Sequence, residues 1–187
     1  DIAGQAAGLP IADLMGGGSR TPAPIASSVG AKTVEETRGV LARYRDRGYW
    51  VHSVKVGGDV DQNIERIQDV ETHRPTKERI LYDANRGFTR QQALRVMQAT
   101  EQWKVMFEQP CETLDDIAAI RPLHSAPVSV DECLVTLQDA TRVARDGIAE
   151  VFGIKLNRVG GLTKASRIRD IALAHGIDIF VMATGGS

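Results

Sequence analysis

The sequence predicts an α/β fold, a (β/α)8 barrel of the TIM type in which parallel strands alternate with covering helices. Seven short runs rich in β-branched residues alternate with longer segments of helical periodicity. The first run is followed by AKTVEE, which is not the glycine-rich turn of a nucleotide-binding open sheet. Charged side chains close five of the runs, at intervals of one strand plus one helix. An open doubly wound sheet is the alternative architecture.

The expected strands are short apolar runs, as buried parallel strands require. They are Ile25–Val29, Trp50–Val56, Ile80–Asp83, Val105–Glu108, Val128–Asp131, Val151–Leu156 and Ile177–Met182. A complete barrel takes about 250 residues, whereas this chain has 187 and stops after its seventh strand. We therefore expect a modified barrel whose last βα unit is missing.

The expected helices carry recognisable start and stop signals. Thr33 is a candidate N-cap followed by Glu35 and Glu36 in the first turn, and Gly176 is a candidate stop for the last helix. The helical segments are Thr33–Arg47, Gln62–His73, Thr89–Thr100, Leu114–Ile120, Leu137–Ala144 and Thr163–His175. Before them, DIAGQAAGLPIADLMGGG is expected to form a helix and a glycine-rich link outside the βα repeat.

Composition excludes several classes of protein. The hydrophobic content of 42% supports a substantial core, and the formal net charge of -1 argues against nucleic-acid binding. No apolar run approaches the roughly 20 residues of a membrane span. Cys111 and Cys133 form neither a disulfide framework nor a zinc pattern, so we expect a reducing cytoplasm.

Five charged residues end consecutive strands: Lys55, Asp83, Glu108, Asp131 and Lys155. Their spacing of 23 to 28 residues is one βα unit each time, so they share the C-terminal rim of the sheet. That rim carries the chemistry of barrel enzymes. Each residue alone has a simpler explanation, because an acidic side chain often caps a turn and a lysine often extends into solvent. Five charged residues at matching positions of consecutive strands favour a functional site.

The order of the charges indicates a metal centre between two bases. Three carboxylates on one rim repel one another unless a cation neutralises them, and Mg2+ is the usual choice for hard oxygen ligands, with Mn2+ as an alternative. Lysines on both sides would face a bound substrate. Removing a proton alpha to a carboxylate leaves a dianionic enediolate, which a divalent ion stabilises. The pattern therefore indicates proton abstraction from a small carboxylate.

These motifs resemble the enolase superfamily, in its mandelate racemase and muconate-lactonizing group. The matching pieces are SVKVG, LYDANRG, MFEQP, VSVDE and IKLNRVGGLTKA, which together cover nearly the whole chain. The resemblance implies Mg2+ held by Asp83, Glu108 and Asp131, with Lys55 and Lys155 as acid/base residues. It also implies that residues 1–20 are the linker helix from an absent N-terminal capping domain and that residues 21–187 are an incomplete barrel. Members commonly form homo-oligomers.

One departure from the family pattern lies on the second strand. The family usually has K-x-K there, and Ser53 replaces the first lysine, so one usual contribution to activating Lys55 is lost. Substrate-binding or supporting roles are expected for Ser53, Asn85, Glu132, Asn157, Thr184 and Gly185.

The sequences of the segments GYWVHSVKVGGDV and GIDIFVMATGGS are similar to those of members that act on proline derivatives. These are cis-3-hydroxy-L-proline dehydratases and proline-betaine 2-epimerases. The resemblance therefore implies a dehydration as the preferred reaction and a 2-epimerisation as the next candidate. Acid-sugar dehydratases and cycloisomerases are alternatives within the superfamily. Outside enzymes, a catalytically inactive barrel kept as a binding module is the alternative, although the five intact rim residues count against it.

Overall fold

The computed structural model describes residues 2–18 and 23–183 of the chain. Seven parallel strands form one sheet in the order β1-β2-β3-β4-β5-β6-β7. The strands are β1 (Ala26–Val29), β2 (Val51–Lys55), β3 (Arg79–Asp83), β4 (Met106–Glu108), β5 (Val128–Val130), β6 (Val151–Lys155) and β7 (Asp178–Met182). Each of the seven expected strands is therefore present, although most are one or two residues shorter than expected.

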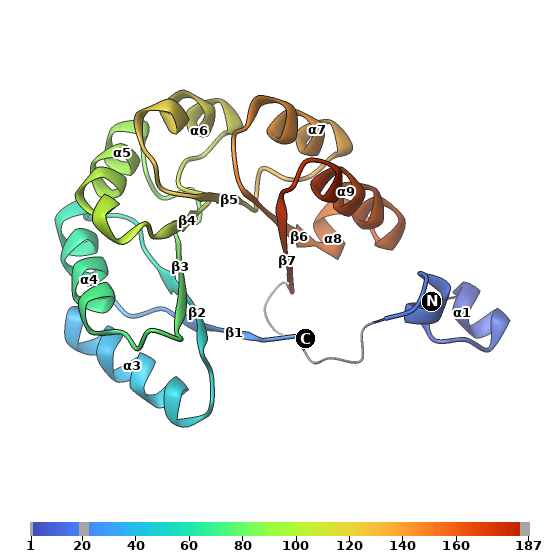
Figure 1. Cartoon of the computed structure of the whole chain (residues 1–187), viewed down its shortest axis with the longest axis horizontal. Helices are drawn as coiled ribbons and strands as arrows, with labels where there is room; N and C mark the ends of the chain where they lie inside the picture. The colour runs from blue at the N-terminus through green and yellow to red at the C-terminus, as the bar shows by residue number, and fades with distance from the viewer. Residues whose placement is uncertain (1, 19–22, 184–187) are drawn as a thin grey trace.

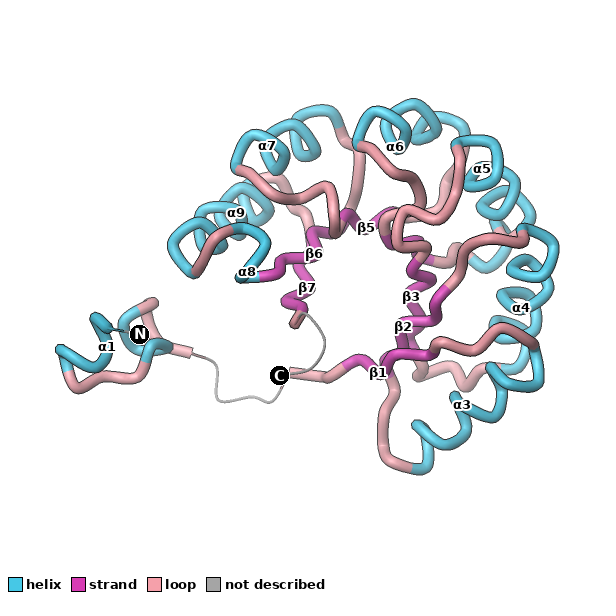
Figure 2. Tube along the Cα trace, turned by 180° about the vertical axis from the view of Figure 1, so that it is seen from behind, coloured by secondary structure: helices cyan, strands magenta, loops and turns pink. Residues whose placement is uncertain are grey.

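The sheet curls into a half-barrel with the helices on its outer side (Figures 1 and 2). Among the described residues, β1 and β7 each pair with a neighbour on one side only, so the ring is open between them. This confirms a parallel α/β sheet with the curvature of a barrel rather than a flat doubly wound sheet. A closed eight-stranded barrel stays a prediction.

Helices of the repeat follow their local capping signals. The helices that cover the sheet are α3 (Val34–Asp46), α4 (Val60–His73), α5 (Arg90–Ala99), α6 (Leu114–Ile120), α7 (Leu137–Asp146) and α9 (Leu162–Ala174). Thr33, Thr89 and Thr136 each form a capping box, in which the threonine side chain and the third helical residue satisfy each other's backbone N–H groups. Helix α7 extends two residues beyond the expected end because Gly147 supplies its left-handed C-cap.

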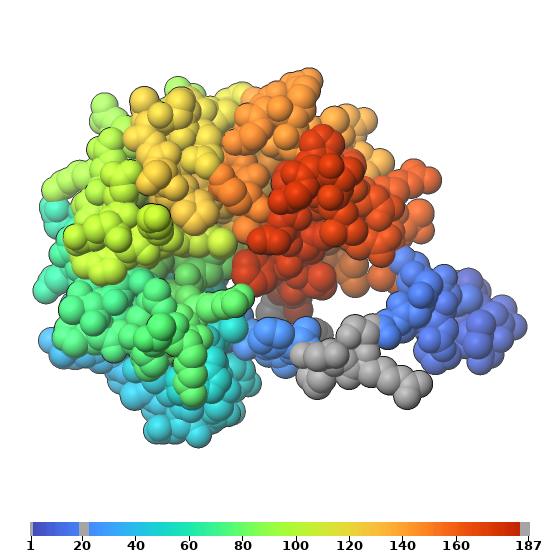
Figure 3. All heavy atoms as spheres, in the orientation of Figure 1, coloured from blue at the N-terminus to red at the C-terminus, as the bar shows by residue number. Residues whose placement is uncertain are grey.

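Two parts of the chain differ from the expected elements. A helical turn α8 (Leu156–Val159) follows β6 directly, where a loop was expected, and Gly160 in the left-handed conformation ends it. The N-terminal segment forms two short helices, α1 (Ile2–Ala7) and α2 (Ile11–Leu14), rather than one. Proline at position 10 cannot donate a backbone hydrogen bond, so it separates them. Both helices lie beside the half-barrel, outside its ring of helices (Figures 1 and 2), and their atoms form the blue group at one side of the space-filling view (Figure 3).

The core lies between the sheet and its outer helices. Tyr82, Phe107 and Phe152 alternate with inward-facing residues on β3, β4 and β6, and all three are fully buried. Burying such a side chain contributes about 1.5–3 kcal/mol relative to leaving it exposed. Because side chains alternate along a strand, the residues between these buried ones point to the inner side of the curved sheet.

A buried polar network ties β1, β2 and α3 together at the start of the strands. Nδ1 of His52 lies 2.6 Å from the Ser27 hydroxyl, and its Nε2 lies 2.8 Å from a carboxylate oxygen of Glu78. Arg45 of α3 donates two hydrogen bonds of 2.8 Å to the same carboxylate. Burial lowers the pKa of His52, so the neutral ring is favoured. His52 therefore has a structural place on the helix side of the sheet.

Candidate active site

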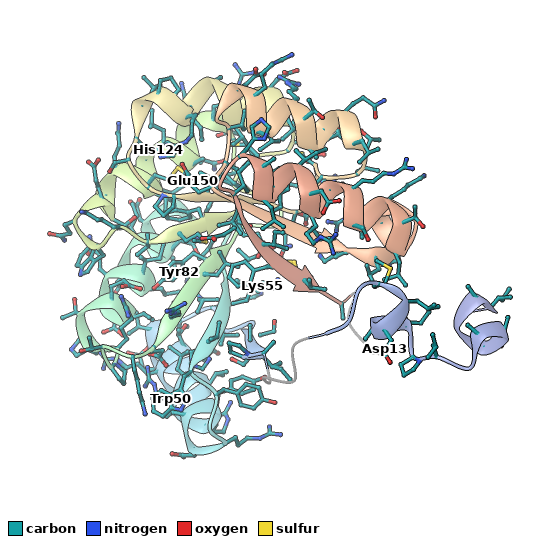
Figure 4. The ribbon with its side chains drawn as sticks, turned by 45° about the vertical axis from the view of Figure 1, so that its right-hand side comes forward. Asp13, Trp50, Lys55, Tyr82, His124 and Glu150 are labelled. Carbon is teal, nitrogen blue, oxygen red and sulfur yellow. The ribbon has the colours of Figure 1, made fainter. Side chains whose placement is uncertain are left out.

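Side-chain alternation along β2 decides which residues face the inside of the half-barrel. The ring of His52 packs against Tyr44 of α3, with ring centroids 6.3 Å apart, so His52 faces the helices. Ser53 and Lys55 stand one and three positions later and face the opposite, inner side. Figure 4 shows Lys55 against the strands and Trp50 well apart from it beside α3.

The register brings the next two charged residues to the same inner level. Lys55 is paired with Asp83 across β2 and β3, and Asp83 is paired with Glu108 across β3 and β4. Paired residues of neighbouring strands point to the same face. Asp131 directly follows β5, and Lys155 is the last residue of β6. All five charged residues therefore end their strands at the C-terminal rim, as their spacing predicted.

Each of the two lysines is paired with a carboxylate. Lys55 donates a hydrogen bond to Asp83, whose side chain is 4% exposed, and Lys155 lies 2.6 Å from Asp131, whose side chain is 1% exposed. The guanidinium of Arg158, from α8, also binds Asp131. Asp131 thus accepts from two cations, and both come from the end of β6 and the turn that follows it.

Glu108 lies within the electrostatic influence of the other four charged residues. Burial first, and then the negative charges of Asp83 and Asp131, raise the pKa of Glu108 to about 8, while Lys55 and Lys155 oppose the rise. The carboxyl group is itself buried, with 2% of the residue exposed. The five residues therefore converge on one centre, in which three buried carboxyl groups have a partly exposed lysine toward each side.

The donor set of this centre fits a hard divalent cation. Asp83, Glu108 and Asp131 offer carboxylate oxygens from three adjacent strands, and burial together with the charges of Asp83 and Asp131 raises the pKa of Glu108, which a cation there would oppose. Within residues 2–18 and 23–183, however, no three His, Cys, Asp or Glu side chains are arranged so that they could hold a metal ion. In this structure, lysine and arginine nitrogens contact two of the three carboxylates instead.

Two loops meet above the carboxylates. Asn85 donates from Nδ2 to Glu132, at 3.0 Å, and its backbone N–H binds Asp83. Arg86 donates to the carbonyl of Glu132, at 3.2 Å. Asn85 and Arg86 both have left-handed backbones, with φ of 44° and 66°, which turn the chain sharply after β3. The predicted residues Asn85 and Glu132 are thus in contact, two positions after Asp83 and one position after Asp131.

The remaining predicted residues lie in different settings. Ser53 faces the inner side two residues before Lys55, opposite Ser28 of β1 and Leu81 of β3, and is half-buried. Asn157 is exposed in the turn α8. Thr184 and Gly185 lie outside the described residues.

Three residues that hold this centre were not assigned to it from the sequence. Arg158 binds Asp131, and a loop arginine three residues after Lys155 gives no such signal by itself. Arg66 is buried in α4 and donates to the carbonyl oxygen of Lys55 at 3.1 Å, which anchors the end of β2. Gln109 follows Glu108 and bonds to the chain after β5. Their partners lie 11 to 27 residues away in the sequence, so no local pattern marks them.

Comparison with known proteins places these features in context. Residues 36–187 match the family model described as enolase C-terminal domain-like. The chain is 31% identical, over 186 residues, to cis-3-hydroxy-L-proline dehydratase of Roseibium aggregatum, covering all of this chain and 51% of that protein. Among the described helices, none is long and apolar enough to cross a membrane.

Two crystal structures superpose on the whole chain. One is of a mandelate racemase/muconate lactonizing enzyme-type protein from Silicibacter pomeroyi, with 81% identity and a TM-score of 0.97 over 52% of that chain. The other, a member of the enolase superfamily from Roseovarius nubinhibens complexed with magnesium, has 38% identity and a TM-score of 0.95 over 51% of its chain. The chain therefore spans about half the length of the relatives it matches.

Proposed function

The chain belongs to the enolase C-terminal domain-like family, in the mandelate racemase/muconate-lactonizing group of the enolase superfamily, and on that premise we propose that it carries the acid/base centre of a Mg2+-dependent enzyme. The reaction is removal of the proton alpha to a carboxylate, and the substrate is a proline-type amino acid. The best-supported overall reaction is dehydration of cis-3-hydroxy-L-proline. The observation that carries the proposal is the convergence of Lys55 and Lys155 on the Asp83, Glu108 and Asp131 carboxylates.

Asp83, Glu108 and Asp131 would hold the metal. When bound there, Mg2+ supplies positive charge that stabilises the negative charge developing on the substrate carboxylate. The relative from Roseovarius nubinhibens with bound magnesium supports this choice of cation. The acidic character of the centre supports it as well, because the three carboxylates are buried and repel one another.

The cationic side chains of the centre have a second role. Lys55 pairs with Asp83, and Lys155 and Arg158 both pair with Asp131, so these cations offset the charge of two of the three carboxylates. We infer that a divalent cation held by Asp83, Glu108 and Asp131 would offset the charge of these carboxylates, so that the Lys55 and Lys155 ammonium groups would be available to a substrate.

The two lysines then divide the proton transfers. One lysine, in its neutral form, takes the alpha proton from its face of the substrate and leaves an enediolate. In dehydration the electron pair returns from the enediolate and forms the Cα–Cβ double bond, while the 3-hydroxyl leaves with a proton as water. The enamine product then tautomerises to the cyclic imine. The atoms balance, since the substrate loses only one molecule of water.

Epimerisation at C2 is the second candidate, and the presence of a lysine on each side favours it. If the substrate has no leaving group at C3, the enediolate persists until the opposite lysine returns a proton to the other face. The same residues support both outcomes, and the substrate decides between them. Ser53, where a lysine is usual, lies on the inner face two residues before Lys55, and we propose that its hydroxyl contacts the substrate.

The test is a substrate panel followed by proton NMR in D2O with Mg2+. The panel contains cis-3-hydroxy-L-proline, L-proline, a proline betaine and one sugar acid. We expect loss of water from 3-hydroxyproline and deuterium at the alpha carbon of compounds without a 3-hydroxyl. Alpha deuteration with inversion but no dehydration would favour the epimerase. The absence of both reactions, together with no Mg2+ binding by calorimetry, would point to a binding module.

For the whole protein, we propose that residues 1–20 link the barrel to a capping domain and that residues 21–187 belong to the catalytic domain. We also propose a homo-oligomer in the cytoplasm. The full-length protein, analysed by light scattering and limited proteolysis, tests the oligomer and the domain boundary.

A further inference from the structure

We propose that Gln109 is a positioning residue that holds the Asp131 carboxylate beside Glu108. The inference rests on the proposed function, because it concerns the carboxylates that would bind the metal. Among the described residues, the side-chain hydrogen bonds of Gln109 go to backbone groups and to the Cys133 thiol, not to the carboxylate oxygens. It acts through the backbone of the segment that follows β5.

The backbone of Gln109 is held in an uncommon conformation. Its φ is 39°, in the left-handed region that residues with a Cβ atom seldom adopt, and its side chain is completely buried. The residue follows Glu108 directly, so this turn sets the direction in which the chain leaves β4. A long polar side chain in a left-handed and buried position requires compensating contacts.

The side chain of Gln109 uses both ends of its amide. Its Oε1 accepts from the backbone N–H of Asp131, at 3.1 Å, and from that of Cys133, at 3.2 Å. Its Nε2 donates to the carbonyl of Cys111, at 3.0 Å, and to Sγ of Cys133, at 2.9 Å. One side chain therefore joins the segments after β4 and after β5.

The main chain of Gln109 extends the connection on both sides. Its N–H donates to the carbonyl of Ser129 in β5, at 2.8 Å. Its carbonyl accepts from the N–H of Arg86 in the loop after β3, at 2.9 Å. Gln109 thus bonds to β5 on one side and to the loop after β3 on the other. Both bonds lie at the level of the Asp83, Glu108 and Asp131 carboxylates.

These bonds matter because Asp131 lies beyond the last hydrogen-bonded residue of its strand. β5 ends at Val130, so the sheet ladder no longer fixes the residue that carries the carboxylate. The bond from the Asp131 N–H to Gln109 takes over that function. A glutamine amide can do this without adding charge, whereas a glutamate there would place a fourth carboxyl group next to the centre.

The test compares Gln109→Met with the wild type in the full-length protein. Methionine has a similar length and volume but cannot form the four side-chain hydrogen bonds. We expect Mg2+ affinity, measured by calorimetry, to fall about 10–100-fold, the usual range for losing a residue that orients a metal ligand. In the metal-free protein, we expect hydrogen exchange at the Asp131 and Cys133 amides to accelerate at least about tenfold, while the Phe152 amide is unchanged.

Two further variants separate positioning from general stability. Val143→Ala removes buried volume from α7, away from the rim, and should lower the melting temperature without changing Mg2+ affinity or exchange at Asp131. Gln109→Asn accepts the left-handed backbone readily but is one methylene shorter, so it should fold and still show the exchange defect. It decides the question if Gln109→Met does not fold.

The outcomes distinguish this inference from the proposed function. Unchanged Mg2+ affinity and unchanged exchange at Asp131 and Cys133 in a folded variant would overturn the positioning role. If the wild type binds no Mg2+, the proposed function fails, while faster exchange in the variants still supports Gln109 as the residue that holds Asp131.

Discussion

Replacing Glu108 by glutamine measures how strongly burial and the neighbouring carboxylates together disfavour the ionised Glu108 side chain. The pKa of Glu108 is raised from its ordinary 4.5 to about 8 by burial and by Asp83 and Asp131. At about 1.36 kcal/mol per pH unit, this corresponds to on the order of 5 kcal/mol of unfavourable free energy for the ionised group. The metal-free folded protein therefore retains a proton on Glu108 at a pH where the unfolded chain has lost it.

The sign of the pH dependence follows from this difference in proton binding. Between pH 4.5 and about 8 the folded state binds more protons at Glu108 than the unfolded state, so the free energy of unfolding falls as the pH rises. In Glu108→Gln that contribution disappears. We expect the variant to be several kcal/mol more stable than the wild type at pH 8, and about equally stable at pH 5, when metal is chelated.

Urea denaturation at pH 5, 6, 7 and 8, with chelator, measures both proteins. Added Mg2+ should remove most of the advantage of Glu108→Gln at pH 8, because the cation neutralises the wild-type carboxylates. Parallel stability profiles for wild type and variant from pH 5 to 8 would refute the reasoning, since they would mean that neither burial nor the neighbouring carboxylates raise the pKa of Glu108.

Three other substitutions test the packing that supports the site. Gly87→Ala would place a Cβ atom 2.7 Å from the Ala84 carbonyl oxygen, so we expect a loss of about 1–3 kcal/mol in urea denaturation and a displaced loop after β3. Glu78→Gln breaks the paired hydrogen bonds from Arg45, and a loss of about 1–3 kcal/mol is expected. Phe107→Ala empties a fully buried position, and calorimetric unfolding should show a loss of about 3–5 kcal/mol.

The strand ends were predictable because apolar runs and capping residues are local signals. Thr33, Thr89 and Thr136 sit at helix starts where their hydroxyls satisfy free N–H groups, and all three of these helices begin within one residue of the expected position. Once the strands were placed, the rim residues followed from one βα unit of spacing. The parallel register then brings Lys55, Asp83 and Glu108 to one level.

Contacts between distant segments were not predictable in the same way. The left-handed backbone of Gln109 could not be predicted from its residue type, because glycine and asparagine favour that conformation and glutamine does not. The ion pair from Arg158 to Asp131 depends on the turn α8, which is too short and too poorly capped to be recognised in the sequence. The bond between Asn85 and Glu132 spans 47 residues and arises only when two loops meet above the sheet.

The most direct test of the two-lysine centre is alpha-proton exchange in D2O with each single lysine variant. With Mg2+ and a pair of proline-type enantiomers, the wild type should exchange both isomers. Lys55→Ala should lose exchange of one isomer and Lys155→Ala exchange of the other, each by at least about 100-fold, while Mg2+ affinity is retained. Exchange of both isomers by either variant at the wild-type rate, or no exchange by the metal-loaded wild type, would contradict the account.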